Sequence, residues 1–427
     1  MMGNTNIDNI NNANTKETQN TDISLYNYDI DISPDENGYT YMNIGPSHPA
    51  THGTLRMKAK LDGEKIIEVE PEIGFLHSGF EKLGEHHTYN QWIVTTDRMN
   101  YLSPLNNNIG YALAVEELLE IEVPERASYI RVILAEISRI ADHFLCQAFF
   151  GLDLGAFTAL LWGFVERERI YDIIEYVTGT RLTTSYTRIG GLAMDLPEGF
   201  EKKILEVCDK LESGVKEIEK LFNKNKIFLD RVCNIGYLSK EDAINFGASG
   251  PIMRASGVEY DIRTHKPYAI YDKLDFNVIT NNYCDCYGRY LVRWGEVRES
   301  IKIIRQAVEK MPKGPVNFGN SKIIQPDKKS TYTDMESLIH HFKVLMTGPT
   351  HGINPKKGEY YSSTEAPNGE LGWHIISDGE ASAYRIAVRS PSLMHFQIIP
   401  HIIKNHHLSD FVAIVGSMNV IAGELDR

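Results

Sequence analysis

The spacing of apolar residues predicts a small β region near the start of the chain. Residues 39–73 alternate between apolar and polar positions, most clearly at Leu55, Met57, Ala59 and Leu61. A repeat of two places alternate side chains on one face of a strand, so strands with one buried face are expected here. Asp62-Gly63 supplies a hairpin turn, and the returning strand begins at Ile66.

From about Leu105 the apolar repeat becomes helical. Pro124 is a favourable first-turn residue. The apolar residues after it recur every three or four positions, at Ile130, Ile133, Leu134, Ile137, Ile140, Ala141, Phe144, Leu145 and Ala148. Further long helices are expected at about 155–176, with an end at Gly179, at 201–222 and at 287–308. Long helices in this number favour a bundle core.

We therefore expect an α+β protein with a central bundle of long helices. The predicted divisions are a mostly disordered N-terminal tail (1–37), a β-rich N-terminal domain (38–100), the helical bundle (101–330) and a mixed α/β C-terminal region (331–427). The tail contains an Asn- and Thr-rich tract that can bury too little apolar surface to offset the entropy of ordering.

The overall composition excludes several classes of function. With 427 residues, 42% of them hydrophobic, the chain can bury a large core. Its formal net charge of −13 argues against nucleic acid as a partner, because such binding needs a basic surface. No apolar run approaches the ~20 residues that span a bilayer, and the first residues do not resemble a signal peptide. We expect membrane association only through partners.

The cysteines and glycines give no sign of a metal, NAD or flavin site within the chain. The five cysteines, at positions 146, 208, 233, 284 and 286, form no C-x-x-C pair, so no complete zinc, haem or iron–sulfur ligand set is expected. The sequence also contains no P-loop and no G-x-G-x-x-G motif.

Candidate chemistry gathers in the segment Gly45-Pro46-Ser47-His48-Pro49-Ala50-Thr51-His52-Gly53. Its prolines and glycines predict a loop of defined shape, and Pro49 prevents the helical spacing of a metal-binding His pair. An imidazole, with a pKa near 6.5, can exchange protons near neutral pH. The phenol of Tyr101 is a candidate companion as a hydrogen-bond donor. For either residue alone, an ordinary packing or hydrogen-bonding role stays open.

Several segments, in order from about residue 38 to 427, match one known family. They are the His loop, Phe75-Leu76-His77-Ser78-Gly79-Phe80-Glu81-Lys82, Arg98-Met99-Asn100-Tyr101-Leu102-Ser103-Pro104, Leu152-Asp153-Leu154-Gly155-Ala156, Arg188-Ile189-Gly190-Gly191, Arg254-Ala255-Ser256-Gly257-Val258, Glu365-Ala366-Pro367-Asn368-Gly369-Glu370-Leu371-Gly372-Trp373, Ser377-Asp378-Gly379 and Gly423-Glu424-Leu425-Asp426-Arg427. Together they resemble the D-type subunits of bacterial respiratory complex I, a family related to the large subunit of nickel–iron hydrogenases.

The resemblance implies a hydrogenase large-subunit-like fold and a quinone site in a proton-translocating NADH–quinone oxidoreductase. It implies that His52 and Tyr101 bind the quinone headgroup. Asp153, expected in the turn between two long helices, would be the carboxylate partner of His52. A carboxylate beside an imidazole raises its pKa and fixes its tautomer, so all three are candidate catalytic residues.

The resemblance also implies that the chain works only in an assembled complex. Electrons would arrive from an iron–sulfur cluster held by a neighbouring subunit, and the NAD binding and flavin chemistry of the complex would belong to other subunits. The implied partners are the B-type iron–sulfur subunit, the C-type subunit and the H-type membrane subunit. The expected location is peripheral, on the cytoplasmic side of the cell (inner) membrane.

The residues at the hydrogenase metal positions exclude a nickel site. In those enzymes two C-x-x-C pairs hold the metals, and the pairs align with residues 98–103 and 417–422 of this chain. Asn100, Ser103 and Asn419 stand among the thiol positions, whereas nickel needs soft thiolate ligands. No metal is therefore expected, and the corresponding space becomes available to an organic headgroup.

This chain departs from many relatives at four positions. It has Asn100 and Asn419 where they have Asp, Thr183 where they often have His beside the terminal cluster, and Ser78 where many have Arg. Loss of cationic or titratable neighbours makes a cluster harder to reduce, which favours menaquinone over ubiquinone. Two alternatives stay open: the same role in a ferredoxin-fed complex without the NADH module, or a non-catalytic scaffold role.

Overall fold

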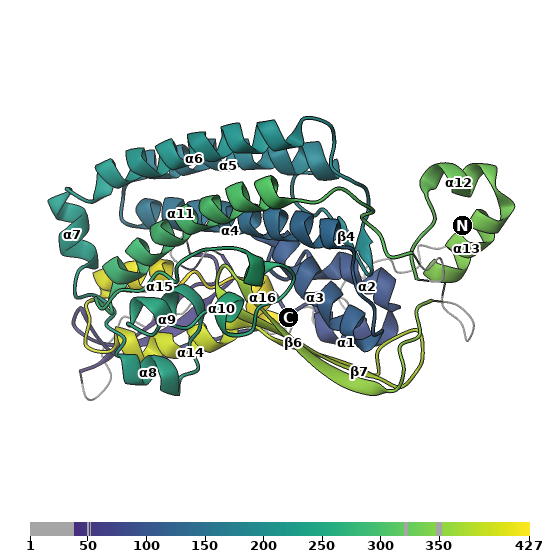
Figure 1. Ribbon diagram of the computed structural model, residues 1–427. Coiled ribbons are helices and arrows are strands. Elements are labelled where there is room, and N and C mark those ends of the chain that lie inside the picture. Colours follow the sequence, from purple (N-terminus) through teal and green to yellow (C-terminus); the bar gives the residue numbers. More distant parts are fainter. Residues whose placement is uncertain (1–37, 49–50, 52, 320–322, 347–351) are drawn as a thin grey trace, which may run out of the picture.

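Long helices form the centre of the molecule (Figure 1). The structure is a computed structural model that describes residues 38–427, apart from 49–50, 52, 320–322 and 347–351. The long helices are α4 (Glu125–Asp153), α5 (Phe157–Thr178), α6 (Phe200–Phe222) and α11 (Cys286–Lys310). Helix α4 packs against α5 and α11, and α6 packs against the same two helices. The predicted bundle is confirmed.

Helix α4 lies at the centre of this bundle. Its residues from 129 to 148 are buried on every side, because α3 (Pro104–Leu118) and α15 (Leu408–Met418) cover the faces that α5 and α11 leave. Gly179 ends α5 in the left-handed conformation, at φ 77°, as expected for a glycine after a helix.

A small antiparallel sheet precedes the bundle. Its strands are β1 (Thr40–Ile44), β2 (Arg56–Asp62) and β3 (Lys65–Glu72), in that order. The alternating residues Leu55, Met57, Ala59 and Leu61 are all buried, and Gly63 turns the hairpin at φ 60°. The sheet and the buried face predicted from the two-residue repeat are therefore confirmed.

A second core joins the segments before and after the bundle. Helices α1 (Phe80–His86), α2 (Tyr89–Thr96) and α3 share it with an antiparallel sheet of β6 (Gly358–Ala366), β7 (Gly369–Ser377) and β8 (Arg385–Arg389). Trp92, Tyr111 and Trp373 meet edge to face, with ring centroids 4.9 to 5.6 Å apart. The alternating pattern did not reveal α1 and α2, whose partners lie almost 300 residues away in the sequence. The predicted domain divisions stay predictions.

The remaining elements are short and mostly connect these layers. They are β4 (Thr187–Arg188), β5 (Gly191–Leu192), α7 (Lys226–Val232), α8 (Lys240–Asn245), α9 (Gly250–Ala255), α10 (Ile262–His265), η3 (Tyr271–Lys273), α12 (Lys328–Thr333), α13 (Met335–Leu345), α14 (Pro391–Ile403) and α16 (Ala422–Asp426). Helices α12 and α13 stand apart from the main body (Figure 1).

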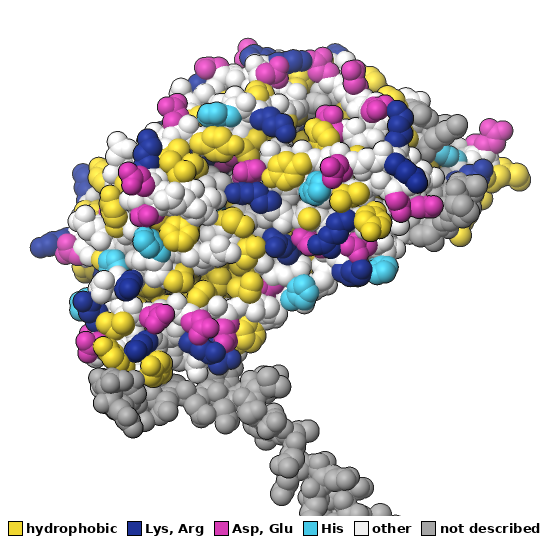
Figure 2. Space-filling view, turned by 90° about the horizontal axis from the view of Figure 1, so that it is seen from below, with side chains coloured by type: hydrophobic (Ala, Val, Ile, Leu, Met, Phe, Trp, Pro, Cys, Tyr) yellow, Lys and Arg dark blue, Asp and Glu magenta, His cyan; other side chains and the backbone are white. Residues whose placement is uncertain are grey.

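The surface carries charges of both signs. Seen from below, Lys, Arg, Asp and Glu side chains are interspersed with apolar ones (Figure 2). The acidic excess is therefore not gathered in one patch on this face.

Among the described helices, none has both the length and the apolar character needed to cross a bilayer. The expected N-terminal tail lies outside the described residues.

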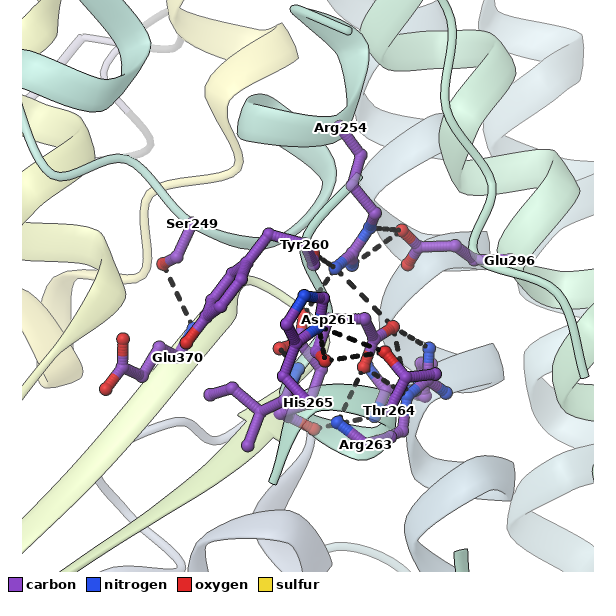
Figure 3. A network of polar contacts seen from close by, with 12 residues as sticks. Ser249, Arg254, Tyr260, Asp261, Arg263, Thr264, His265, Glu296 and Glu370 are labelled. Atoms are coloured by element: carbon purple, nitrogen blue, oxygen red, sulfur yellow. Dashed lines mark hydrogen bonds and ion pairs between the residues drawn. The ribbon is translucent and has the colours of Figure 1, made fainter. Parts of the chain in front are cut away.

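A buried ionic network ties the bundle to the second core (Figure 3). Arg254 of α9 is fully buried and contacts Glu296 of α11 and Glu365 of β6, each at 2.8 Å. Arg263 of α10 pairs with Asp261 at 2.7 Å and with Glu136 of α4 at 3.1 Å. Removing one member would leave its partners as buried, unpaired charges, so the network fixes these elements relative to one another.

The network should make the chain sensitive to acid. Burial alone would raise the pKa of Glu136 and Glu296, but the neighbouring arginines outweigh it and lower each pKa from 4.5 to about 2. Carboxyls with a lowered folded-state pKa stabilise the fold above pH 4.5, and this contribution is lost as the pH falls to about 2. The urea midpoint of the purified chain should therefore fall over this interval; a constant midpoint would contradict the account.

Candidate functional site

A cavity of about 770 Å³ opens between α4, α15 and the loops that hold His48 and Tyr101. Most of its wall is apolar, and its polar groups are few. The wall consists of His48, Thr54, Leu55, Tyr101, Leu102, Leu145, Cys146, Phe149, Leu152, Asp153, Val412, Val415, Gly416, Asn419, Val420, Ile421 and Ala422. Such a wall suits an apolar organic molecule that is held by a few polar contacts.

Tyr101 lies on this wall in the turn between α2 and α3. Asn100 shapes the turn, since its Oδ1 accepts hydrogen bonds from the backbone N–H groups of Leu102, at 3.2 Å, and Ser103, at 3.3 Å. Burial raises the pKa of the Tyr101 phenol, and the nearby charge of Asp142 adds to the effect. The hydroxyl therefore keeps its proton at neutral pH and can donate it to a ligand oxygen.

Asp153 reaches the same wall from α4. The sequence placed it in the turn after the helix, and this was wrong by one position: Asp153 is the last residue of α4, and the turn begins at Leu154. A Cβ on Gly416 of α15 would lie 2.9 Å from Asp153 Oδ2. The glycine thus leaves room for the carboxylate at the edge of the cavity.

His52 lies outside the described residues, as do Pro49 and Ala50, but the other residues of the loop are described. His48 and Thr54 both line the cavity. The Thr51 hydroxyl donates to the carbonyl oxygens of His48, at 2.9 Å, and Pro46, at 3.1 Å. Gly45, at φ 91°, has no room for a Cβ, which would collide with the Leu55 carbonyl oxygen. The described part of this loop therefore borders, through His48, the same cavity as Tyr101 and Asp153.

Asn100 and Asn419 both bind buried carboxyl groups. Asn100 Nδ2 donates to Glu424 Oε2 and to Asn368 Oδ1, both at 3.0 Å. Asn419, on the cavity wall, donates through Nδ2 to Asp142 Oδ1 at 2.8 Å. Burial raises the pKa of both Glu424 and Asp142. Amide–carboxyl pairs thus occupy these positions.

Sequence reasoning did not identify Asp142 as part of this region. The signal that could have found it is its helical spacing to Asp153: residues 142, 145, 146, 149, 152 and 153 follow one face of α4. The cavity residues of that helix are the last five of them.

The described residues do not form a metal site. Among them, no group of three or more His, Cys, Asp or Glu side chains is arranged to hold a metal ion. The five cysteines are free. Burial raises the pKa of Cys146, on the cavity wall, to about 11, so this residue stays a thiol and not the thiolate that metals bind.

Comparison with known proteins identifies the family. The family model for the 49 kDa subunit of the respiratory-chain NADH dehydrogenase matches residues 153–427. The chain belongs to this family. It is 47% identical to the D-type subunit of the NADH-quinone oxidoreductase of Geotalea uraniireducens over 386 residues, which cover 90% of this chain and 98% of that protein.

Other members of the 49 kDa family show the same extent of similarity. One of the D-type subunits of the NADH-quinone oxidoreductase of Rhizobium etli is 48% identical over 387 residues, which cover 90% of this chain and 95% of that one. The D-type subunit of Leptospira biflexa is 45% identical over 389 residues, which cover 91% and 95%. The α+β fold and the family expected from the sequence are confirmed.

Proposed function

We propose that this chain forms the quinone site of an NADH–quinone oxidoreductase as its D-type subunit. The observation that carries the proposal is the cavity of about 770 Å³, whose mostly apolar wall includes a phenol and a carboxylate. Its volume and lining suit a quinone headgroup with the start of its isoprenoid tail. Membership in the 49 kDa family supports the same function.

Tyr101 and His52 would bind the headgroup and supply protons. Reduction of a quinone to a quinol takes two electrons and two protons, and the electrons would come from an iron–sulfur cluster of a neighbouring subunit. The protons need donors within hydrogen-bonding reach of the two carbonyl oxygens. The Tyr101 hydroxyl would donate to one oxygen, and Asp153 would hold the His52 imidazole in its protonated form.

The partners and location are part of this proposal. We place the chain next to the B-type iron–sulfur subunit, the C-type subunit and the H-type membrane subunit, peripherally on the cytoplasmic side of the membrane, in a complex that translocates protons. Helix α5 exposes Phe157, Leu161, Trp162 and Val165 by 40 to 60% each. An apolar stripe of this kind fits a chain that neighbouring subunits cover.

Narrowing the cavity should weaken quinone binding in proportion to the size of the new side chain. Val412 of α15 lies on the wall, so Val412→Trp should raise the KM for quinone at least about tenfold, a loss of about 1.4 kcal/mol in binding. Val412→Ala, the matched control, should leave KM within about twofold. Quinone titrations of NADH oxidation in membranes, with assembly checked on native gels, test this. Equal KM values for both variants would place the quinone elsewhere.

The cluster next to this chain should have a reduction potential that depends little on pH. Thr183 lies two residues before Ser185, whose N–H and hydroxyl donate to Asp97 at 2.9 and 2.8 Å. Threonine does not titrate between about pH 6 and 8, whereas an imidazole does. Thr183→His should make the reduction potential of the cluster depend on pH and should raise it, because an imidazolium favours the reduced cluster. Thr183→Val, the control, should change neither the potential nor its pH dependence. Redox titration of the cluster's EPR signal at several pH values measures the potential and its pH dependence. A wild-type potential that changes steeply with pH would contradict the prediction and the preference for menaquinone.

A further inference from the structure

Asp142 lies fully buried behind the wall of the cavity. It stands one helical turn before Leu145 and Cys146 on the face of α4 that lines the cavity. Its Oδ1 accepts a hydrogen bond from Asn419, which itself lines the cavity. The side chain of Asn419 thus connects Asp142 to the cavity assigned to the quinone.

The hydrogen bonding of Asp142 fits a carboxyl group that holds a proton. Its second oxygen, Oδ2, makes no hydrogen bond to any residue in the described ranges. A buried carboxylate with one oxygen unpaired is costly, whereas a carboxylic acid there loses much less solvation. Burial accordingly raises the pKa of Asp142.

Asp142 and Tyr101 form an interacting pair of acids. The Asp142 charge raises the pKa of the Tyr101 phenol, so the two groups resist carrying negative charge together. A free phenol has a pKa near 10 and a free carboxyl group one near 4. Once Tyr101 has given up its proton, the phenolate is therefore the stronger base, and this difference drives the transfer of the Asp142 proton to Tyr101.

We propose that Asp142 stores the proton that restores Tyr101 after each transfer to the reduced quinone. This inference rests on the proposed function. An iron–sulfur cluster of a neighbouring subunit would supply, one at a time, the two electrons that reduce the quinone. The Tyr101 O–H bond breaks and its proton forms one O–H bond of the quinol, while His52 supplies the proton of the other. The Asp142 O–H bond then breaks, its proton restores the Tyr101 hydroxyl, and the carboxylate takes up a proton from solvent.

Several charged or titratable groups face Asp142, and they bear on its pH dependence. They are His143 and Cys146 on α4, Arg293 on α11, Glu424 on α16, and Tyr101 before α3. The Nε2 atom of His143 lies 2.8 Å from Glu296 Oε2, so this imidazole is held by a different carboxyl group. Asp142 differs from the other carboxyls in contacting the cavity through Asn419 while also acting on Tyr101.

Asp142→Asn in the assembled complex tests the proposal. The variant keeps the size of the side chain and an oxygen for Asn419, but it cannot carry the proton. Turnover should fall about tenfold or more with an unchanged KM for quinone. In the wild type, turnover should fall as the pH rises through the raised pKa of Asp142 and this residue loses its proton; this decline should be absent in the variant. Asp142→Glu should restore both the rate and the decline in part.

A double variant separates proton supply from a structural role. Because Asp142 acts through Tyr101, Asp142→Asn should cause no further loss of turnover in a Tyr101→Phe background, whereas a structural defect would add to it. Wild-type turnover and pH profile in Asp142→Asn, with Tyr101→Phe impaired, would overturn this inference alone. Wild-type turnover in Tyr101→Phe would overturn the proposed function itself.

Asn419→Asp decides the question if Asp142→Asn fails to assemble. It is nearly isosteric, and aspartate tolerates the left-handed conformation of this position, at φ 52°. It would place a second carboxyl 2.8 Å from Asp142, so the pair would hold a proton to higher pH and the decline in turnover should move to higher pH. An unmoved decline would overturn the proposal.

The matched control is Asp97→Asn. Asp97 is also a buried acid whose pKa is raised by burial, but it accepts hydrogen bonds from Ser185 and does not border the cavity. Its variant should keep the wild-type decline. Loss of the same decline in Asp97→Asn would show that removing any buried acid produces it, which would also overturn the proposal.

Discussion

Tyr101→Phe should lower the turnover of quinone reduction about a hundredfold while the complex still assembles. The change removes one hydroxyl, with almost no change in volume, from a side chain on the cavity wall. A positioned proton donor contributes about a hundredfold or more to such a rate. Turnover of NADH oxidation with a soluble quinone, in membranes with matched amounts of complex, measures the effect.

Tyr176→Phe is the control for this substitution. Tyr176 and Tyr101 are both 39% exposed, but the Tyr176 hydroxyl donates to the Glu198 carbonyl oxygen, away from the cavity. Its loss should leave turnover within about twofold of the wild type, in line with the small effect of removing one exposed hydrogen bond. Equal turnover in both variants would remove Tyr101 from the site.

Arg254→Met should prevent normal assembly of the complex or strongly lower its thermal stability. The substitution removes the cation that lies 2.8 Å from both Glu296 and Glu365. Breaking a buried ion pair by removing one partner costs about 3–5 kcal/mol, a large part of the ~5–15 kcal/mol that stabilises a typical domain. The amount of complex on native gels and its inactivation temperature measure the effect.

Arg305→Met shows whether burial causes this loss. Arg305 also pairs with two carboxylates, Asp209 at 2.7 Å and Glu212 at 3.3 Å, but its side chain is 41% exposed. Ion pairs at the surface contribute about 0–1 kcal/mol, so this variant should assemble normally and inactivate near the wild-type temperature. If Arg254→Met behaves in the same way, the buried network does not hold the two cores together.

The parts of the fold that the sequence predicted are those set by local patterns. The bundle helices and the β2–β3 hairpin follow from apolar repeats of 3.6 and 2, and these repeats act over a few residues. Helices α1 and α2 were missed because their burial depends on the C-terminal sheet, through contacts such as that between Trp92 and Trp373. The pairing of Arg254 with Glu296 and Glu365 has no local signal either.

The candidate site also contains residues that have a local signal in the sequence and residues that have none. The sequence predicted Tyr101 and Asp153 as site residues because they lie in segments that match a family, and both line one cavity. Their roles stay predictions, as does that of His52, which lies outside the described residues. Asp142 was missed because its contact with Asn419 joins residues 277 positions apart. Such contacts form when α15 packs on α4, which no short stretch of sequence specifies.

The position of the quinone can be seen in a density map of the assembled complex with quinone bound. We expect the headgroup in the cavity between α4 and α15, with one carbonyl oxygen within about 3.2 Å of the Tyr101 hydroxyl and the other facing the loop that contains His52. A headgroup bound elsewhere, with this cavity filled by side chains of a neighbouring subunit, would contradict this expectation.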